Sequence, residues 1–294
     1  MTLMLFPMDN FISRAIQFRQ TFQKWRKHLK TSFKMITLLC LSSVVSAAAW
    51  AKDIATYLRA AQEFQRLVAE ETQKHRMPRM TNKKVAELIA TLSDSQNFLE
   101  SKSYTLKDLG PLGSVCGQAH AATMSYAYFG LIRTIDAKGY PIAPAGQTLK
   151  VMEKNVVAFQ EELTQLHPFF VRCMAKTIPL SHEFVLSLKP EQFTQVRRLG
   201  LSQVRKGTFQ MYYGTLQMAK AKDATIKEHY VVNLLQAMAE TAPHYASVLQ
   251  LSARRQVFDL AEAGESTATP KLRGYFKKIA EAMNSTGCEG LCKF

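Results

Sequence analysis

The side chains of this chain most suited to proton transfer are a histidine and several polar residues that recur at helical spacing. His120 lies four residues after Cys116, in a stretch of small residues. A helix there would place both on one face, because residues four apart are helix neighbours. Histidine exchanges its proton near neutral pH. A pocket between this helix and a longer one would bring His120 close to five polar residues of the longer helix: Gln203, Gln210, Gln217, Tyr212 and Tyr213.

Other catalytic and metal-binding patterns are absent from the sequence. Leu186 stands where His182-Glu183 would need a second histidine to make a zinc-binding motif. Glu71 and His75 are four residues apart, which is more typical of a surface ion pair. The methionines follow core spacing, which favours gap filling over copper ligation. We therefore predict no metal and no cofactor, and the alternative for each histidine is a core residue bonded to a main-chain carbonyl.

The longer helix is predicted over residues 189–223. Pro190 suits its first turn, where a missing N–H is tolerated. Small residues recur every seven positions along it and share a face with the glutamines; they are Gly200, Gly207, Gly214 and Ala221. Aromatic residues lie on the opposite side, and a helix that is apolar on both sides is usually buried. The glycine face either packs closely on another helix or lines a ligand groove.

The helix that carries His120 is predicted over residues 116–138. Small residues also recur every seven positions here, at Cys116, Thr123, Gly130 and Ala137. Two helices with matching small faces can approach each other closely. We therefore predict that Gly130 packs near the glycine face of the 189–223 helix.

Residues 1–51 resemble an export signal with a long basic start. Residues 1–34 contain seven Lys or Arg and one acid, and an apolar run of 16 residues follows Met35. Ala49-Trp50-Ala51 fits a small-x-small cleavage pattern. The run is short and contains several hydroxyl residues, which disfavours a membrane span. We predict cleavage, with residues 52–294 exported to the periplasm or secreted, and an uncleaved anchor is the alternative.

The exported part is basic. The whole chain has a net charge of +15; the leader contributes 7 − 1 = +6, which leaves +9. Because export conflicts with nucleic-acid binding, the sequence favours either an ordinary solvated surface or attachment to an anionic envelope component.

Four cysteines remain after the predicted cleavage, which suggests two disulfides. Cys288 and Cys292 are held close by the chain. We therefore favour this pair, which leaves Cys116 to pair with Cys173. A redox pair or a metal clip is the alternative for the Cys288–Cys292 segment.

The fold class is predicted to be all-α. Apolar residues follow the helical three-and-four spacing through most of the exported part, and no convincing strand pattern appears. Residues 101–113 are predicted to be a loop. New helices are predicted to start at His167-Pro168 and at Thr241, two residues before Pro243. The result is one bundle-like domain of about eight to ten helices.

Three functions fit these observations. The first is a non-enzymatic binding or envelope-associated module, whose partner would be an anionic envelope component or another envelope protein. The second is an enzyme with its site between the 116–138 and 190–222 helices. The third, attachment to an anionic surface, requires lysines and arginines gathered on one side of the molecule.

Overall fold

The computed structural model describes residues 44–100, 103–131, 134–135, 141–142, 147–220, 226–285, 287–288 and 290–294. The described chain is all-α, as the sequence predicts. Its nine α-helices are α2 (Val44–Gln73), α3 (Lys83–Leu92), α4 (Leu109–Ala127), α5 (Gln147–Ala158), α6 (Gln160–Ser187), α7 (Gln195–Lys220), α8 (Glu228–Val248), α9 (Leu251–Glu265) and α10 (Pro270–Met283).

Shorter elements join these helices. One π-turn and three 3-10 turns are described: η2 (Gln96–Glu100), η3 (Leu106–Asp108), η4 (Pro190–Gln192) and η5 (Gly290–Lys293). A two-residue antiparallel ladder pairs β1 (Thr134–Ile135) with β2 (Pro141–Ile142), with Thr134 opposite Ile142.

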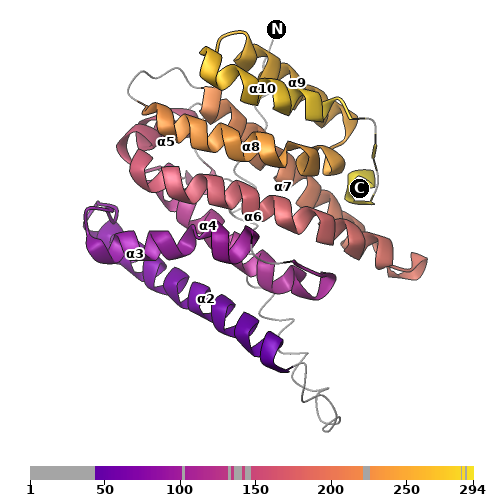
Figure 1. The fold of residues 1–294 in the computed structure, drawn as a ribbon, viewed down its shortest axis with the longest axis horizontal. Helices are drawn as coiled ribbons and strands as arrows, with labels where there is room; N and C mark the ends of the chain where they lie inside the picture. The colour runs from indigo at the N-terminus through magenta and orange to yellow at the C-terminus, as the bar shows by residue number, and fades with distance from the viewer. Residues whose placement is uncertain are drawn as a thin grey trace.

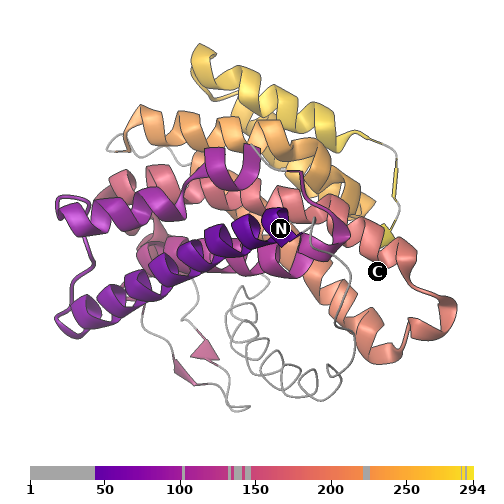
Figure 2. The ribbon, with the colours of Figure 1, turned by 60° about the horizontal axis from the view of Figure 1, so that its bottom comes forward.

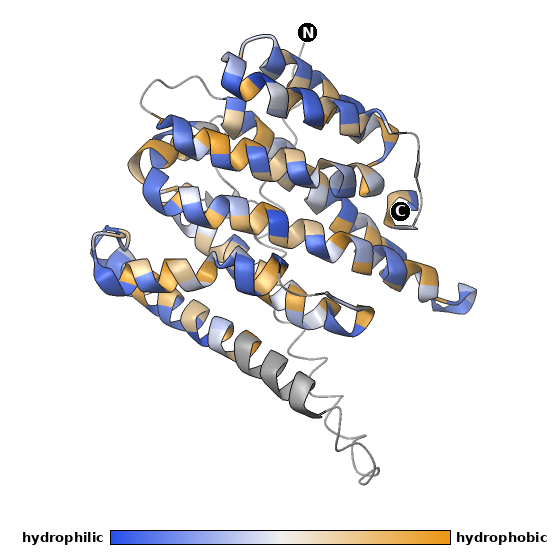
Figure 3. Cartoon of the chain, in the orientation of Figure 1, coloured by the Kyte–Doolittle hydropathy of each residue, from blue (hydrophilic) through white to orange (hydrophobic). Residues whose placement is uncertain are grey.

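The even-numbered helices pack in a row. Figure 1 shows α2, α4, α6, α8 and α10 stacked one on the next, with α6 in the middle. α7 packs on α8 and α9, and α5 contacts α4 and α6. Figure 3 shows hydrophobic and hydrophilic residues interleaved along these helices, the pattern of amphipathic elements. Their buried apolar side chains form one cluster that extends from α2 to η5.

Buried tyrosines connect neighbouring elements within this cluster. Tyr57 donates to the main-chain oxygen of Leu92 at 3.0 Å, and Tyr245 donates to that of Val171 at 2.8 Å. A buried phenol without a partner would lose the hydrogen bonds it makes to water. These hydroxyls therefore fix the spacing between helices as well as filling the core.

A buried carboxylate ties α6 to the chain before α3. The Glu162 side chain is 1% exposed; its Oε1 accepts a hydrogen bond from the main-chain N–H of Met80 at 3.0 Å and forms an ion pair with Arg79, whose Nε lies at 3.2 Å. A charge at this depth is tolerated only when it is paired and hydrogen-bonded.

α4 covers a different range from the predicted 116–138 helix. It starts at Leu109, so part of the predicted 101–113 loop is helical, and Pro111 lies in the first turn, where proline is tolerated. The predicted close packing of Gly130 on the glycine face of the 189–223 helix is wrong. Gly130 lies beyond the end of α4 with φ +74°, a left-handed conformation that follows many helix ends. A Cβ on Gly130 or Gly200 would meet no atom within 4 Å.

Prolines lie inside two helices that the sequence analysis had divided. The break between α5 and α6 falls at Phe159, and α6 continues through Pro168 and Pro179. α8 likewise continues through Pro243, and the Thr241 hydroxyl bonds back to the Ala237 oxygen instead of starting a helix. Each proline removes one backbone hydrogen bond, but burial of the surrounding side chains maintains the helix.

The 189–223 helix is divided near its start and is not buried throughout. Pro190 opens η4, and α7 begins only at Gln195. Val196 and Leu199 on its first turns are 81% and 60% exposed, whereas Tyr212 further along is fully buried. The prediction of a core helix is therefore correct for the second half and wrong for the first.

Gly264 allows α9 and α10 to approach each other. A Cβ at this position would overlap the ring of Phe276, which is 2% exposed and cannot move outward freely. We expect Gly264→Ala to lower the free energy of unfolding by about 1–3 kcal/mol, the usual penalty for overpacking a core. Urea unfolding would measure the loss. Gly274→Ala is the control, because a Cβ on Gly274 meets no atom within 4 Å; equal losses in the two variants would contradict this account.

Candidate functional site

A small pocket lies between α4 and α7. Its volume is about 50 Å³. Among the described residues its lining comprises His120, Met124, Tyr128, Met152, His167, Gln210, Met211, Gly214, Thr215 and Met218. We call this cavity the His–Met pocket. Two imidazoles and four thioethers line it, contributed by α4, α5, α6 and α7.

His167 is held on both sides of its ring. Its Nδ1 lies 3.1 Å from the Tyr230 hydroxyl and its Nε2 lies 3.2 Å from the Thr215 hydroxyl. His167 is 1% exposed, and burial lowers its pKa to about 3, with a further small contribution from His120. The imidazole is therefore neutral at physiological pH.

His120 reaches the same pocket from α4. Its ring centroid lies 4.8 Å from that of Phe170, and burial lowers its pKa to about 4. The pocket therefore contains two imidazoles, neither of which carries a charge at neutral pH.

The sequence-based candidates divide into two groups. His120 and Gln210 line the pocket. Tyr212 is buried and donates to the main-chain oxygen of Met238 at 2.9 Å, and Tyr213 packs against Phe209 with ring centroids 5.4 Å apart. The remaining two glutamines are not lining residues: Gln203 is partly exposed and Gln217 is exposed.

His167 and the methionines were not among the candidates. His167 precedes Pro168 and was interpreted as part of a helix start, which hid its position in the middle of α6. Met211 and Met218 lie seven residues apart on one face of α7. That spacing was visible in the sequence, but it does not distinguish a core position from a pocket wall.

No carboxylate lines the His–Met pocket among the residues that the structure describes. An enzyme at this position would need a group to orient or charge the histidine, and the lining offers only neutral partners. Over the described ranges, no three His, Cys, Asp or Glu side chains cluster as a metal site.

The four cysteines lie at disulfide distance in the favoured pairs. Cys116 on α4 and Cys173 on α6 have their sulfur atoms 2.02 Å apart, and those of Cys288 and Cys292 are 2.09 Å apart. The first pair joins two helices of the central row. The second closes the segment that leads into η5, where the Cys292 sulfur lies 3.4 Å from the Leu249 oxygen.

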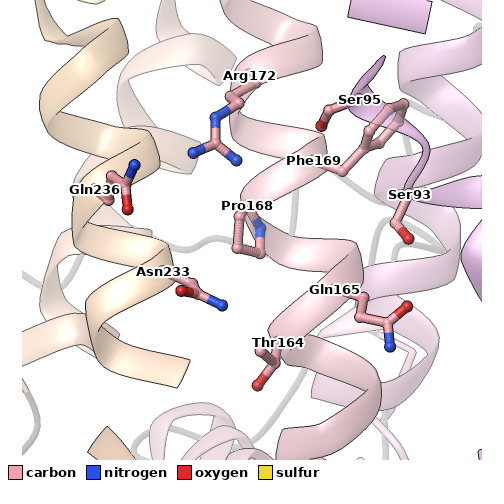
Figure 4. A pocket seen from close by; sticks show the side chains of 9 residues that line it. All are labelled: Ser93, Ser95, Thr164, Gln165, Pro168, Phe169, Arg172, Asn233 and Gln236. Carbon is pink, nitrogen blue, oxygen red and sulfur yellow. The ribbon is translucent and has the colours of Figure 1, made fainter. Parts of the chain in front are cut away.

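A larger, polar groove lies on another side of α6. Its volume is about 410 Å³, and Figure 4 shows its side chains contributed by α6, α8 and the segment after α3. The lining comprises Ser93, Ser95, Thr164, Gln165, Pro168, Phe169, Arg172, Asn233 and Gln236. Arg172, the one cation among its described lining residues, is compensated, because it donates to Glu240 from Nε and Nη2 at 3.0 and 2.9 Å.

The end of α6, η4 and the start of α7 form a projecting arm, residues 186–206, here called the α6–α7 arm. Figure 2 shows it extending past the other described helices. Four large apolar side chains of the arm are strongly exposed: Leu186 66%, Val196 81%, Leu199 60% and Val204 48%. Val196, Leu199 and Val204 share one face of α7, because offsets of three and eight residues return to the same side.

The same arm is basic. It contains five basic residues and one acidic residue, namely Lys189, Arg197, Arg198, Arg205, Lys206 and Glu191. All of these side chains except that of Arg205 are exposed. The Arg197 and Arg198 guanidinium groups donate to main-chain oxygens at 2.8 and 3.1 Å, and that of Arg198 also lies over the ring of Phe193. The arm therefore presents apolar and positively charged side chains together.

Residues 290–294 pack against the arm through Phe294. The rings of Phe193 and Phe294 stack with centroids 5.5 Å apart, and Arg205 donates to the Phe294 oxygen at 3.4 Å. These two contacts fix the arm to the C-terminal segment.

The chain matches no protein-family model, no curated protein and no solved structure. Within the described ranges, no helix has both the length and the apolarity needed to cross a lipid bilayer.

Proposed function

We propose that this chain is an exported, non-enzymatic module that binds an anionic membrane surface of the cell envelope through the α6–α7 arm. The observation that carries the proposal is the exposure of Val196 and Leu199, at 81% and 60%, on a basic projection. Export rests on the leader-like residues 1–51, which include the basic start and the apolar run.

The chemistry of the arm fits a lipid interface better than it fits water. Apolar side chains that enter the headgroup region gain free energy by burial, and each Lys or Arg near an anionic surface contributes about 1 kcal/mol. Exposed apolar groups on a soluble surface are common singly, but four of them on a short projection form a patch. Another envelope protein is the alternative partner, and it would not require anionic lipid.

Vesicle sedimentation tests this proposal. We expect the predicted exported chain, residues 52–294, to sediment with vesicles that contain phosphatidylglycerol and much less with pure phosphatidylcholine vesicles, with binding that weakens as salt is raised. The Val196→Ser, Leu199→Ser double variant should bind about tenfold more weakly, because it loses apolar burial while keeping every charge.

The chain offers a matched control. Leu251 is 74% exposed on α9, outside the arm, so Leu251→Ser should leave binding unchanged. Equal sedimentation with neutral and anionic vesicles, or an equal loss in the Leu251→Ser variant, would refute attachment through the arm.

The enzyme hypothesis has weaker support. The His–Met pocket lies where that hypothesis requires a site, and it contains His120 and Gln210. It has no carboxylate among its described lining residues, and four of the five proposed partners lie outside that lining, namely Gln203, Gln217, Tyr212 and Tyr213. The structure therefore favours binding over proton transfer at this position.

A further inference from the structure

The His–Met pocket gathers soft donor atoms from four helices. Met124 lies one turn after His120 on α4, and Met211 and Met218 share a face of α7. Met152 on α5 and His167 on α6 complete the set. Thioether sulfur is a soft ligand that favours Cu(I), and imidazole also binds copper, whereas magnesium and calcium require oxygen ligands.

The charge of the pocket selects among soft ions. Its described lining contains no carboxylate and no thiol, so every donor there is neutral when the imidazoles are unprotonated. A divalent ion would bring two uncompensated charges into a largely apolar cavity, which is expensive in a medium of low polarity. A monovalent ion brings only one. The lining therefore disfavours Zn(II) relative to a soft monovalent cation.

The histidines are in a state suited to ligation. Burial lowers the pKa of His120 to about 4 and that of His167 to about 3, so no proton has to be displaced near neutral pH. Tyr230 faces Nδ1 of His167 from outside the pocket lining. Thr215 faces Nε2 and is one of the lining residues. When Nδ1–H donates to Tyr230, Nε2 carries the lone pair on the pocket side, where it accepts from the Thr215 hydroxyl at 3.2 Å, and a bound ion would replace that hydrogen bond. An outer hydrogen bond of this kind orients many metal-binding histidines.

We propose that the His–Met pocket binds one soft monovalent metal ion, Cu(I), through the His120 and His167 imidazoles and thioethers of the surrounding methionines. A cavity of about 50 Å³ has room for a single ion and excludes an organic cofactor. The proposal does not depend on attachment to a membrane, because the pocket and the α6–α7 arm use different residues.

Cu(I) titration of the predicted exported chain, residues 52–294, with its disulfides intact, tests the proposal, because Cys40 of the leader would add a free thiol that binds Cu(I). Copper would be supplied with ascorbate under anaerobic conditions, in competition with a coloured Cu(I) chelator, and Ag(I) would serve as a redox-inert probe. We expect one ion per chain for both metals. Zn(II) should not displace the ion at equal concentration.

Methionine-to-leucine variants separate ligation from packing, because leucine keeps the volume and removes the sulfur. The Met124→Leu, Met211→Leu double variant should bind Cu(I) at least tenfold more weakly while its melting temperature stays close to that of the parent. The matched control is Met174→Leu: Met174 is a partly buried residue of α6 outside the pocket, and its replacement should leave affinity unchanged.

Three results would overturn the proposal. They are binding of less than one Cu(I) per chain, unchanged affinity in the double variant, and displacement of the ion by an equal concentration of Zn(II). Methionines that only fill space would give the second result.

Discussion

Replacing Cys116 and Cys173 together by alanine should lower the free energy of unfolding by about 4 kcal/mol. The disulfide joins residues 57 apart in sequence, and in the chain-entropy account a loop of that size strongly restricts the unfolded chain. Both cysteines are fully buried between α4 and α6, so removing the sulfurs also loosens the packing there. Urea unfolding of the variant and the parent would measure the loss.

The second disulfide is the internal comparison. Cys288 and Cys292 are only four residues apart, so the same account gives about 2 kcal/mol for their replacement. If removing Cys288–Cys292 destabilises the protein more than removing Cys116–Cys173, loop closure does not dominate the stability of this fold.

Lowering the pH from 7 to 5 should remove about 4 kcal/mol of stability through two histidines. The pKa of His167 is lowered to about 3 and that of His120 to about 4, both by burial, whereas an exposed histidine titrates near 6.5. Between the folded-state and unfolded-state pKa values, each histidine is protonated in the unfolded chain and neutral in the folded chain. The free energy of unfolding is therefore unaffected by these histidines above pH 6.5. It decreases as the pH falls toward 4, by about 1.4 kcal/mol per pH unit for each histidine.

Urea unfolding at several pH values between 7 and 5 would measure this slope. Most carboxyl groups remain ionised in that window, so the histidines dominate it. His167→Gln should reduce the slope by about half. His229→Gln is the control, because His229 is exposed, and it should leave the slope unchanged. A parent protein equally stable at pH 5 and pH 7 would show that the two imidazoles can be protonated in the folded state.

Local sequence patterns predicted the helical class and the Cys288–Cys292 pair, because both depend on short-range information, and the Cys116–Cys173 pair then followed by elimination. Three-and-four spacing is a property of each segment alone, and Cys288 and Cys292 cannot separate far. Helix boundaries at prolines depend on tertiary packing as well as on local sequence. Pro168 and Pro243 lie within α6 and α8 because surrounding side chains keep those helices intact, and that support comes from neighbours distant in sequence.

The exposure of the α6–α7 arm is the second feature that sequence patterns missed. Val196, Leu199 and Val204 predict burial when the helix is considered alone. They are exposed because α7 begins beyond the edge of the helices on which it packs. Similarly, the stripe that contains Gly200 and Gly207 suggested helix packing, although only Gly207 of the two is buried.

The pocket itself could be anticipated only in outline. His120 and Gln210 were recognisable as candidates, because each lies on a face rich in small residues. His167 comes from a third helix, and its presence in the pocket depends on how α6 packs relative to α4 and α7. No spacing rule along one segment contains that information.

A single turn of α6 borders two cavities. His167 lines the His–Met pocket, while Pro168 and Phe169, the next two residues, line the polar groove shown in Figure 4. A ligand that rotates or shifts this turn at one cavity changes the shape of the other. Occupancy of the two would then be thermodynamically linked, and the factor by which the first ligand alters the affinity of the second must equal the factor in the reverse direction.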